Sequence, residues 1–338
     1  METYLPVGKL PRHLLASLLN RYANLTAGVV LGPRIGEDAA VLEMSDRYLV
    51  VSTDPITFAT REMGHYAVTV NANDVVTCGA RPRWFLMNLL LPEGASAAEV
   101  ESLFQQVHAA CRGLEVGLVG GHTEVTPGLD RPLLIGTMIG EVAKDRLVVT
   151  SGAQVDDDLL LTKGIAVEGT AILARERETF LRSRGYSEES IQRAQAYLDD
   201  PGIGVAKEAL VAVETARVGA MHDPTEGGLS AGLYELSEAA GVGLEVEEAQ
   251  ISILDDTRRL CEEFRLDPLG LIASGALLIT CRPGDTSQLL RAIQAAGVPV
   301  RKIGRVVPQT RGVVLIGPQG VKPFPAFERD EIVKIFAE

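Results

Sequence analysis

The sequence has few aromatic residues and few cysteines, and it contains no long apolar run. Aromatic residues make up 5% of the chain, with a single tryptophan. The four cysteines, Cys78, Cys111, Cys261 and Cys281, stand far apart with no C-x-x-C pair, which argues against a disulfide framework and a cysteine zinc site. No apolar stretch approaches the ~20 residues that cross a bilayer, and the first residues do not resemble a secretory signal. We therefore expect a soluble cytoplasmic protein without a membrane partner.

Basic residues are scarce as well, since 32 Lys and Arg oppose 45 Asp and Glu and leave a net charge of −13. A field of this sign repels phosphate backbones, so we expect no nucleic-acid partner. Hydrophobic residues reach 46% of the 338 residues. This composition is ordinary for globular proteins, and the length suits two domains with separate cores.

Short strand patterns alternate with helix patterns along the chain. Strands are predicted at 48–55, 84–91, 133–142 and 159–162, helices up to about 26 and at 62–78, 97–112, 205–218 and 229–240, and a charged, solvated helical stretch at 175–197. Such alternation is typical of α+β or mixed α/β proteins. The turn-rich segment 149–158 contains Ser151-Gly152 and three successive aspartates, so we predict one domain over residues 1–150 and a second over residues 151–338.

The common nucleotide-binding motifs are absent from the sequence. Neither the P-loop pattern G-x-x-x-x-G-K-[ST] nor the dinucleotide pattern G-x-G-x-x-G occurs. The stretch 228–232 matches the hydrolase pattern G-x-S-x-G, but no other pattern supplies the Asp and His partners of a catalytic triad. Ser230 is explained as well by a local hydrogen bond near a helix start.

Acidic residues recur where predicted strands and helices begin or end. Asp38, Asp54, Asp74, Glu124 and Asp223 hold such positions, accompanied by Asn71, Asn73, His122, Thr123 and Thr225. Any single acid is more often a cap or a surface charge, but Asn71 and Asp74 share one face of an otherwise apolar helix and need partners there. Carboxylates and amides suit Mg²⁺, and the bound ion would attract phosphates that these acids alone repel.

Glycines, histidines and one lysine accompany the acids. The glycines whose backbone N–H groups we expect near phosphate oxygens are Gly36, Gly120, Gly121, Gly227 and Gly228. Lys163 follows a predicted strand directly, and it is either a phosphate contact or an exposed surface lysine. His122 and His222 adjoin the acids, although a single histidine is more often structural than catalytic.

Six motifs together resemble the PurM-like superfamily, and they occur in that family's order. They are GEDAAV (36–41), STDPIT (52–57), VNANDV (70–75), GARPRW (79–84), GGHTE (120–124) and DPTEGG (223–228). The superfamily includes aminoimidazole ribonucleotide (AIR) synthetase, thiamine-monophosphate kinase, selenophosphate synthetase and the hydrogenase-maturation protein HypE. The motifs are most similar to those of the HypE group, and the similarity runs from about residue 32 to about residue 279.

The resemblance implies a PurM-like two-domain fold, with an N-terminal α+β domain whose strands build a dimeric β-barrel and a C-terminal α/β domain. It also implies that ATP and Mg²⁺ bind in a cleft. Asp38, Asp54 and Asp74 match the family's metal and phosphate positions. The residues expected at the nucleotide are Gly36, Asn71, Asn73, Gly120, Gly121, Lys163, Asp223, Thr225, Gly227 and Gly228. His122 and Glu124 are the expected catalytic residues, which would orient the acceptor.

The sequence differs from the HypE pattern at three places that concern the acceptor rather than the nucleotide. HypE ends in a cysteine that carries a thiocarbamate and is dehydrated to a thiocyanate, whereas this sequence ends in Phe336-Ala337-Glu338. HypE also reads Asp-Thr-Lys where this chain has His122-Thr123-Glu124, and Glu-Gly-Lys where this chain has Ala273-Ser274-Gly275-Ala276. We therefore expect a relative that keeps ATP binding and has changed or lost its acceptor.

Several functions stay open on the sequence alone. The first is transfer of a phosphoryl group from ATP to an amide, carbonyl or phosphate oxygen of a separate, unidentified acceptor, with hydrogenase maturation and a maturation partner protein as one setting. The alternatives are a nucleotide-binding regulator or assembly partner without turnover, a small-molecule kinase of the thiamine-monophosphate type, and thiocyanate chemistry on an internal cysteine. A homodimer is expected from the family.

Overall fold

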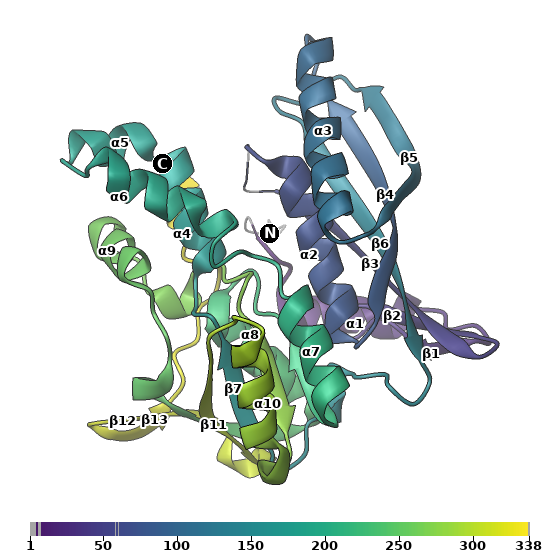
Figure 1. Cartoon of the computed structure of the whole chain (residues 1–338), viewed down its shortest axis with the longest axis vertical. Coiled ribbons are helices and arrows are strands. Elements are labelled where there is room, and N and C mark those ends of the chain that lie inside the picture. The colour runs from purple at the N-terminus through teal and green to yellow at the C-terminus, as the bar shows by residue number, and fades with distance from the viewer. Residues whose placement is uncertain (1–4, 6–7, 58, 60, 337–338) are drawn as a thin grey trace, which may run out of the picture. The chain divides into compact units, whose positions relative to one another are not determined.

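The computed structural model describes residues 5, 8–57, 59 and 61–336. The chain forms two compact units, each with a sheet of its own (Figure 1). The N-unit comprises residues 27–31 and 38–147, and the C-unit comprises the described parts of residues 1–26, 32–37 and 148–338. The mixed α/β class expected from the sequence is confirmed.

The N-unit is built on a six-stranded sheet in the order β1-β2-β3-β6-β4-β5. Its strands are β1 (Val29–Leu31), β2 (Ala40–Met44), β3 (Arg47–Ile56), β4 (Arg81–Leu91), β5 (Gly117–Val125) and β6 (Leu133–Ala143). Neighbouring strands pair antiparallel, except that β4 and β5 run parallel. The helix α3 (Ala97–Gly113) connects these two strands, because a parallel pair requires a crossover.

Helix α2 (Met63–Thr77) is the buried helix of the N-unit, as the apolar pattern at 62–78 predicts. It packs on β3 and β6 and also on α3. Glycines in β6 allow this close approach, because a Cβ at Gly136 would lie 2.5 Å from the side-chain nitrogen of Asn71. The side chains of α2 are thereby brought directly onto the sheet.

The C-unit is built on a seven-stranded sheet in the order β13-β12-β9-β11-β7-β10-β8. Its strands are β7 (Asp158–Thr162), β8 (Val218–His222), β9 (Val242–Glu247), β10 (Leu278–Cys281), β11 (Val300–Pro308), β12 (Val313–Gly317) and β13 (Gly320–Pro323). Its helices are α1 (Arg12–Tyr22), α4 (Val167–Glu176), α5 (Glu178–Ser183), α6 (Glu188–Gln195), α7 (Ala206–Thr215), α8 (Gly228–Ala240), α9 (Asp255–Phe264), α10 (Pro283–Ala295) and α11 (Val333–Phe336).

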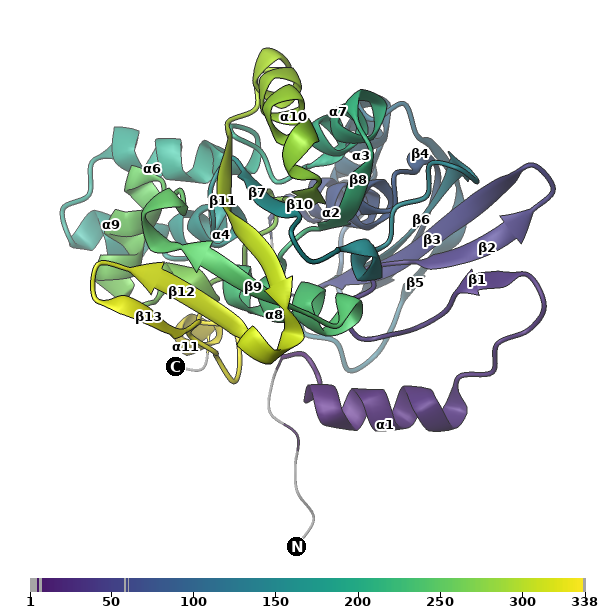
Figure 2. The ribbon, with the colours of Figure 1, turned by 90° about the horizontal axis from the view of Figure 1, so that it is seen from below.

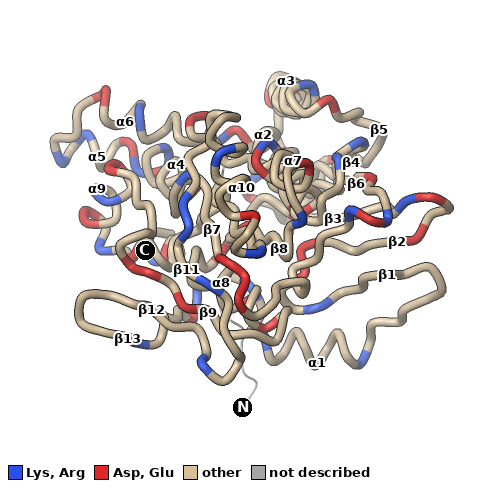
Figure 3. The backbone as a smooth tube through the Cα atoms, turned by 60° about the horizontal axis from the view of Figure 1, so that its bottom comes forward, with Lys and Arg blue, Asp and Glu red and all other residues tan. Residues whose placement is uncertain are grey.

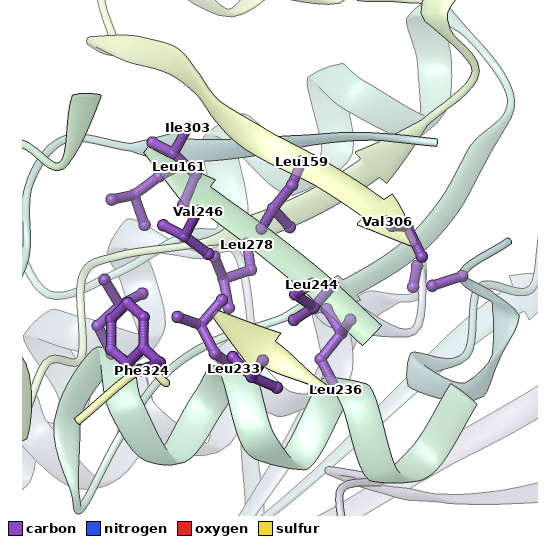
Figure 4. Packing of buried hydrophobic residues seen from close by; sticks show 14 of the residues in the cluster. Leu159, Leu161, Leu233, Leu236, Leu244, Val246, Leu278, Ile303, Val306 and Phe324 are labelled. Carbon is purple, nitrogen blue, oxygen red and sulfur yellow. The ribbon is translucent and has the colours of Figure 1, made fainter. Parts of the chain in front are cut away.

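Helix α8 packs its leucines against the sheet of the C-unit. Leu233 and Leu236 pack with Leu244 and Val246 of β9 in one apolar cluster (Figure 4). All four side chains are fully buried, and each such burial contributes about 2 kcal/mol relative to exposure. This packing fixes α8, and with it the polar turn that precedes the helix.

Two helical stretches of the C-unit lie near its surface. The pattern predicted up to about residue 26 is helical only from Arg12 to Tyr22 (Figure 2), and none of the residues of α1 is buried. The charged stretch at 175–197 is helical as predicted, and α5 and α6 carry both acidic and basic residues (Figure 3). Within the described residues, no helix is long and apolar enough to span a membrane.

Candidate functional site

Asn71 joins α2 to β3 in the N-unit. Its Oδ1 accepts a hydrogen bond from the backbone N–H of Asp54 at 2.9 Å, and its Nδ2 donates to the carbonyl oxygens of Asp54 at 3.3 Å and Ala67 at 2.8 Å. Strand β2 pairs with β3 only as far as Val51. Beyond that point the amide of Asn71 satisfies a strand edge that would otherwise need another strand. The partner that Asn71 requires is therefore the backbone of β3.

Asp74 lies one turn further along α2 and also contacts β3. Its side chain is 5% exposed, and its Oδ2 accepts a short hydrogen bond from the hydroxyl of Ser52. Ser52 and Asp54 are two residues apart in one strand and so face the same side of the sheet. The side chains of Asp54 and Asp74 therefore both lie on the α2 side of β3.

The other ligands expected in the N-unit are Asp38, which is half-buried just before β2, and Asn73, which is fully buried in α2. Among the described residues, no group of three or more His, Cys, Asp or Glu side chains could hold a metal ion. Mg²⁺ commonly takes one or two protein carboxylates and completes its coordination with water and phosphate oxygens. The oxygen donors of Asp54 and Asp74 fit that ion.

His122 and Glu124, the expected catalytic pair, lie on the edge strand β5, and both are exposed. His122 Nε2 lies 3.1 Å from Oε2 of Glu124, while the hydroxyl of Thr126 donates to Oε1 at 2.7 Å. The hydrogen bonds from Thr126 and His122 lower the pKa of Glu124, so this carboxylate is charged at neutral pH. The two side chains form one exposed polar pair on a single face of the strand.

Gly120 and Gly121 precede this pair on β5. Gly121 has a φ of +138°, and a Cβ there would overlap the carbonyl oxygen of Met87 on β4. At Gly120 a Cβ would meet only the side chain of Leu86, at 3.6 Å. The requirement for glycine at position 121 therefore arises from strand pairing.

The turn 223–228 connects β8 to α8 in the C-unit. Asp223 follows β8 directly and is 2% exposed, and the carbonyl oxygen of Thr225 accepts hydrogen bonds from the N–H groups of Gly228 and Ala273 at 3.0 and 3.2 Å. Gly227 and Gly228 have φ values of +88° and +67°, where side chains are strained. The backbone conformation of the turn therefore favours glycine at both positions.

The N–H group of Gly227 already donates to a carboxylate of the protein. Its partner is Oδ2 of Asp330 at 2.5 Å, and Oδ1 of Asp330 accepts from the N–H of Ile332 at 2.8 Å. Burial raises the pKa of Asp330 to about 6, although these backbone hydrogen bonds act in the opposite direction. A phosphate that used the N–H of Gly227 would therefore have to replace Asp330.

Gly36 lies in the C-unit, beside α8. Its φ is +80°, and a Cβ there would lie 2.5 Å from the carbonyl oxygen of Glu235. The next residue, Glu37, accepts hydrogen bonds from the N–H groups of Thr150 and Ser151, both at 3.1 Å. This part of the GEDAAV motif is therefore tied to the C-unit by packing and by a carboxylate cap.

Lys9 is brought to the turn 223–228 by ionic contacts around Glu235. His222 Nε2 lies 3.1 Å from Oε2 of Glu235, and Lys9 Nζ lies 3.8 Å from Oε1. Burial alone would raise the pKa of Glu235, but Lys9, His222 and Arg12 lower it to about 2. Lys9 Nζ also donates to the hydroxyl of Thr225 at 3.3 Å. No local sequence signal identifies Lys9, because its partners are more than 200 residues away.

Lys163 is a buried structural lysine. Its side chain is 5% exposed, and Nζ lies 3.1 Å from Oε1 of Glu208. Nζ also donates to the carbonyl oxygens of Gly202 at 3.1 Å and Gly204 at 2.5 Å. An ammonium group has three N–H donors, so these three acceptors leave none for a phosphate. The exposed surface position considered for Lys163 is wrong, because the side chain is buried.

Glu168, in the first turn of α4, is a buried acid that the sequence analysis did not single out. It is 6% exposed, and its Oε2 has no hydrogen-bond partner among the described residues. Burial raises the pKa of Glu168 to about 7, opposed by hydrogen bonds from the hydroxyl and N–H of Ser274 and supported by the charges of Asp330 and Glu226. The available signal was one acid directly after the apolar stretch 164–167.

Comparisons with known proteins cover both units. The family description "AIR synthase related protein, N-terminal domain" matches residues 36–142, and "AIR synthase related protein, C-terminal domain" matches residues 154–317. A carbamoyl dehydratase HypE of Cupriavidus necator is 30% identical over 83% of this chain and 80% of its own length. A putative hydrogenase expression/formation protein of Methanocaldococcus jannaschii is 25% identical over 91% of both chains.

Solved structures share the fold over nearly the whole length. A hydrogenase maturation protein HypE in complex with ATP has a TM-score of 0.71 at 25% identity, covering 96% of this chain and 98% of that one. A structure of a HypE–HypF complex has a TM-score of 0.74 at 19% identity, covering 93% of this chain and 99% of that one. A thiamine monophosphate kinase (ThiL) complexed with AMPPCP and TMP gives 0.72 at 21% identity, over 94% of both. The PurM-like two-domain fold is thus confirmed, and the chain belongs to the AIR synthase-related superfamily and, within it, to the family of HypE.

Proposed function

We propose that this protein uses ATP and Mg²⁺ to phosphorylate, and so activate, an amide, carbonyl or phosphate oxygen of a separate acceptor during hydrogenase maturation. The observation that carries the proposal is the similarity to carbamoyl dehydratase HypE across both units. The similarity to a HypE structure in complex with ATP supports the choice of ATP as the nucleotide. The six motifs quoted above supply acids and glycines of the kind that Mg²⁺ and phosphates require.

In the N-unit, Asp38, Asp54 and Asp74 are the proposed Mg²⁺ ligands. The bound ion would supply the positive charge that allows phosphates near these acids. Ser52 orients Asp74 through its hydrogen bond, and Asn71 holds the backbone of Asp54. The other proposed nucleotide contacts of the N-unit are Asn73, Gly120 and Gly121.

In the C-unit, the turn 223–228 is the proposed phosphate-binding element. Thr225 offers a hydroxyl, and Lys9 places a positive charge beside it. The N–H of Gly227 becomes a phosphate donor when Asp330 moves away. The other proposed contacts are Gly36, Asp223 and Gly228, whereas Lys163 is left out because its three donors are in use.

The burial of the cysteines supports the proposal that the acceptor is not a cysteine of the described chain. All four cysteines are buried. Burial raises the pKa of Cys111 and Cys281 to about 11 and that of Cys261 to about 12. Such thiols stay protonated and are poor nucleophiles. His122 and Glu124, exposed on β5, are the residues proposed to orient the acceptor.

The edge strand β5 supports the proposal of a homodimer. Every residue of β5 is exposed, and among the strands of the described residues only β4 pairs with it. Leu118, Val119 and Val125 of this strand are exposed apolar side chains. An exposed apolar edge strand invites pairing with another chain. The HypE–HypF complex supports a maturation protein as a further partner.

The first test is nucleotide binding followed by turnover. We expect isothermal titration calorimetry to detect binding of a non-hydrolysable ATP analogue in the presence of Mg²⁺ and weaker binding after EDTA treatment. Asp74→Asn should reduce ATP turnover by at least tenfold, because it removes one of the proposed ligand charges, while the exposed Asp130→Asn serves as the control. Equal turnover in the two variants would remove Asp74 from the proposed site.

The similarity of fold to thiamine monophosphate kinase provides the competing function. Incubation with γ-labelled ATP and thiamine monophosphate would transfer the label to the small molecule if the protein were such a kinase. Incubation with a carbamoyl donor and ATP, followed by mass spectrometry of the chain, shows whether the protein itself becomes modified. An unmodified chain with ATP consumed in the presence of an added carboxamide supports the separate acceptor.

A further inference from the structure

Strand β4 begins with two exposed arginines that the proposed function does not use. Arg81 and Arg83 belong to the GARPRW motif, and residues two apart in a strand face the same side of the sheet. The pairing of β4 with β6 shifts between Pro82 and Trp84, so Arg83 is the extra residue of a β-bulge. Such bulges re-aim side chains and recur beside functional sites.

The two arginines meet a third, Arg47, at a cavity of about 290 Å³ in the N-unit. Arg47 lies on β3 and Glu141 on β6, the strand that runs between β3 and β4. Asp46, Val142 and Ala143 complete the lining. Pockets for small molecules measure about 300–1,000 Å³, so this cavity has the size for a small organic molecule.

Glu141 contacts arginines on both sides of β6. Its Oε1 accepts a hydrogen bond from Nη1 of Arg47 at 3.2 Å, and its Oε2 lies 3.7 Å from Nε of Arg83. Asp46 accepts two further hydrogen bonds from Arg47, from Nε at 3.0 Å and from Nη2 at 2.9 Å. The Nη groups of Arg83 have no hydrogen-bond partner among the described residues, so their four N–H donors are available to a ligand.

The lining of this cavity carries an excess of positive charge. Three arginines oppose two acids there, although the whole chain has a net charge of −13. The side chains of Arg47 and Arg83 are about half exposed, at 45% and 51%. Exposed ion pairs contribute little to stability, so an incoming anion replaces Glu141 beside these arginines at little cost.

We propose that this cavity binds a small organic anion through a carboxylate or phosphate group, held by the Nη groups of Arg83 together with Arg47 and Arg81. A guanidinium group presents its donors in a planar fork that matches both kinds of oxyanion. Strand β3 pairs without interruption from Arg47 to Ile56, so Arg47 and Asp54, seven residues apart, face opposite sides of the sheet. The anion site therefore lies on the face away from the proposed Mg²⁺ ligands.

The test measures the binding of two probes to the full chain at low ionic strength. Inorganic phosphate represents phosphate esters, and succinate represents carboxylates. We expect calorimetry to detect binding of at least one probe at millimolar concentration, and added sodium chloride to weaken it, because salt screens exposed charges. Trp84 is the only tryptophan of the chain and directly follows Arg83, so its fluorescence provides a second readout beside the cavity.

Three variants locate the bound probe. Arg83→Gln removes the charge and the fork at the loss of one contact of 3.7 Å, and we expect it to weaken probe binding about tenfold or more. Arg112→Gln, an exposed arginine of α3, is the matched control and should bind within about twofold of the wild type. Glu141→Gln should strengthen binding about threefold or more, because it removes the carboxylate that competes for Arg47 and Arg83.

The inference is overturned if neither probe binds a wild-type protein that circular dichroism shows to be folded. Equal probe affinity in the wild type and in a folded Arg83→Gln variant would also overturn it, because the anion would then bind elsewhere. If Arg83→Gln does not fold, unchanged affinity in Glu141→Gln is the contradicting result. The ATP analogue should bind all three variants within about twofold of the wild type, since the two sites lie on opposite faces of the sheet.

Discussion

The buried amide of Asn71 makes three hydrogen bonds, two of them with the backbone of Asp54. We predict that Asn71→Leu lowers the free energy of unfolding by about 2–4 kcal/mol, because two partly buried backbone groups of Asp54 lose their hydrogen-bond partner and the amide-binding position is filled by an apolar side chain. Urea denaturation followed by circular dichroism measures this change. The exposed Asn88→Leu on β4 is the control and should stay within about 0.5 kcal/mol of the wild type.

The ion pair of Lys163 and Glu208 is almost completely buried, with side-chain exposures of 5% and 1%. Lys163→Met removes one charge and leaves the other uncompensated, so we expect a loss of about 3–5 kcal/mol of stability. The double variant Lys163→Met/Glu208→Met should recover part of that loss. Urea denaturation of the two single variants and the double variant provides the thermodynamic cycle. Strictly additive losses would show that the two charges do not depend on each other.

Asn71 and Asp74 are examples of what residue chemistry predicts by itself. Two polar groups on a buried helix face require partners, and the structure supplies them from Asp54 and Ser52 on β3. Lys9 and Lys163 could not be assigned in this way. A lysine after a strand looks the same in sequence whether its ammonium group faces solvent or three buried acceptors, because those acceptors come from other segments of the chain.

At the scale of elements, the pairing of β4 with β5 depends on one glycine. Gly121 has a φ of +138°, and its missing Cβ would overlap the carbonyl oxygen of Met87. We predict that Gly121→Ala destabilises the protein by about 2–4 kcal/mol, because the strained backbone and the overlap force the strands apart. Gly120→Ala, whose Cβ would have an ordinary contact of 3.6 Å, is the matched control. Equal melting temperatures for the two variants would contradict this explanation.

Strand β5 was missed from the sequence for a related reason. Its residues include Gly117, Gly120 and Gly121, and glycines normally indicate a loop. Strand β3 was predicted to stop at Pro55 but continues to Ile56, since Pro55 still pairs with Ile135 of β6. Both strands lie where pairing with a neighbouring strand outweighs local propensity. Elements with a strong apolar pattern, such as α2, were predicted at nearly their observed positions.

At the scale of the molecule, the order of motifs allowed the fold class and the family to be predicted. The grouping of α1 with the C-unit could not be predicted, because it depends on contacts between residues distant in sequence. Arg12 donates to the carbonyl oxygen of Ala231 at 3.2 Å, and Lys9 donates through its backbone N–H to Glu226 at 3.0 Å. Charge and hydropathy patterns describe residues that are neighbours along the chain, so they do not predict contacts between residues that are far apart in the sequence.

The pH dependence of the stability of the whole molecule involves three acids whose pKa values are shifted by folding, two upward and one downward. Burial raises the pKa of Glu168 to about 7 and that of Asp330 to about 6, whereas nearby cations overcome burial and lower the pKa of Glu235 to about 2. An acid with a raised pKa binds more protons in the folded than in the unfolded state between its two pKa values. Folding stability therefore falls as the pH rises through that range.

The sign of the pH dependence follows from these shifts. Glu168 contributes stability that is complete below pH 4.5 and lost by about pH 7, and Asp330 acts likewise between pH 3.8 and about pH 6. Glu235 contributes stability above pH 4.5 that is lost as the pH falls toward 2. We therefore predict that the free energy of unfolding, measured with urea, is lower at pH 7.5 than at pH 5 by a few kcal/mol. Each unit by which folding shifts a pKa corresponds to about 1.4 kcal/mol.

Glu168→Gln isolates one contribution to this pH dependence. The glutamine does not titrate, so the variant should lose less stability between pH 5 and pH 7.5 than the wild-type protein does. Glu176→Gln, whose side chain is only partly buried on the same helix, should keep the wild-type slope. If Glu168→Gln kept the full slope, the loss of stability would have to come from Asp330, and Asp330→Asn would then flatten the profile below pH 6. A profile unchanged in both variants would show that neither carboxyl group retains its proton on folding.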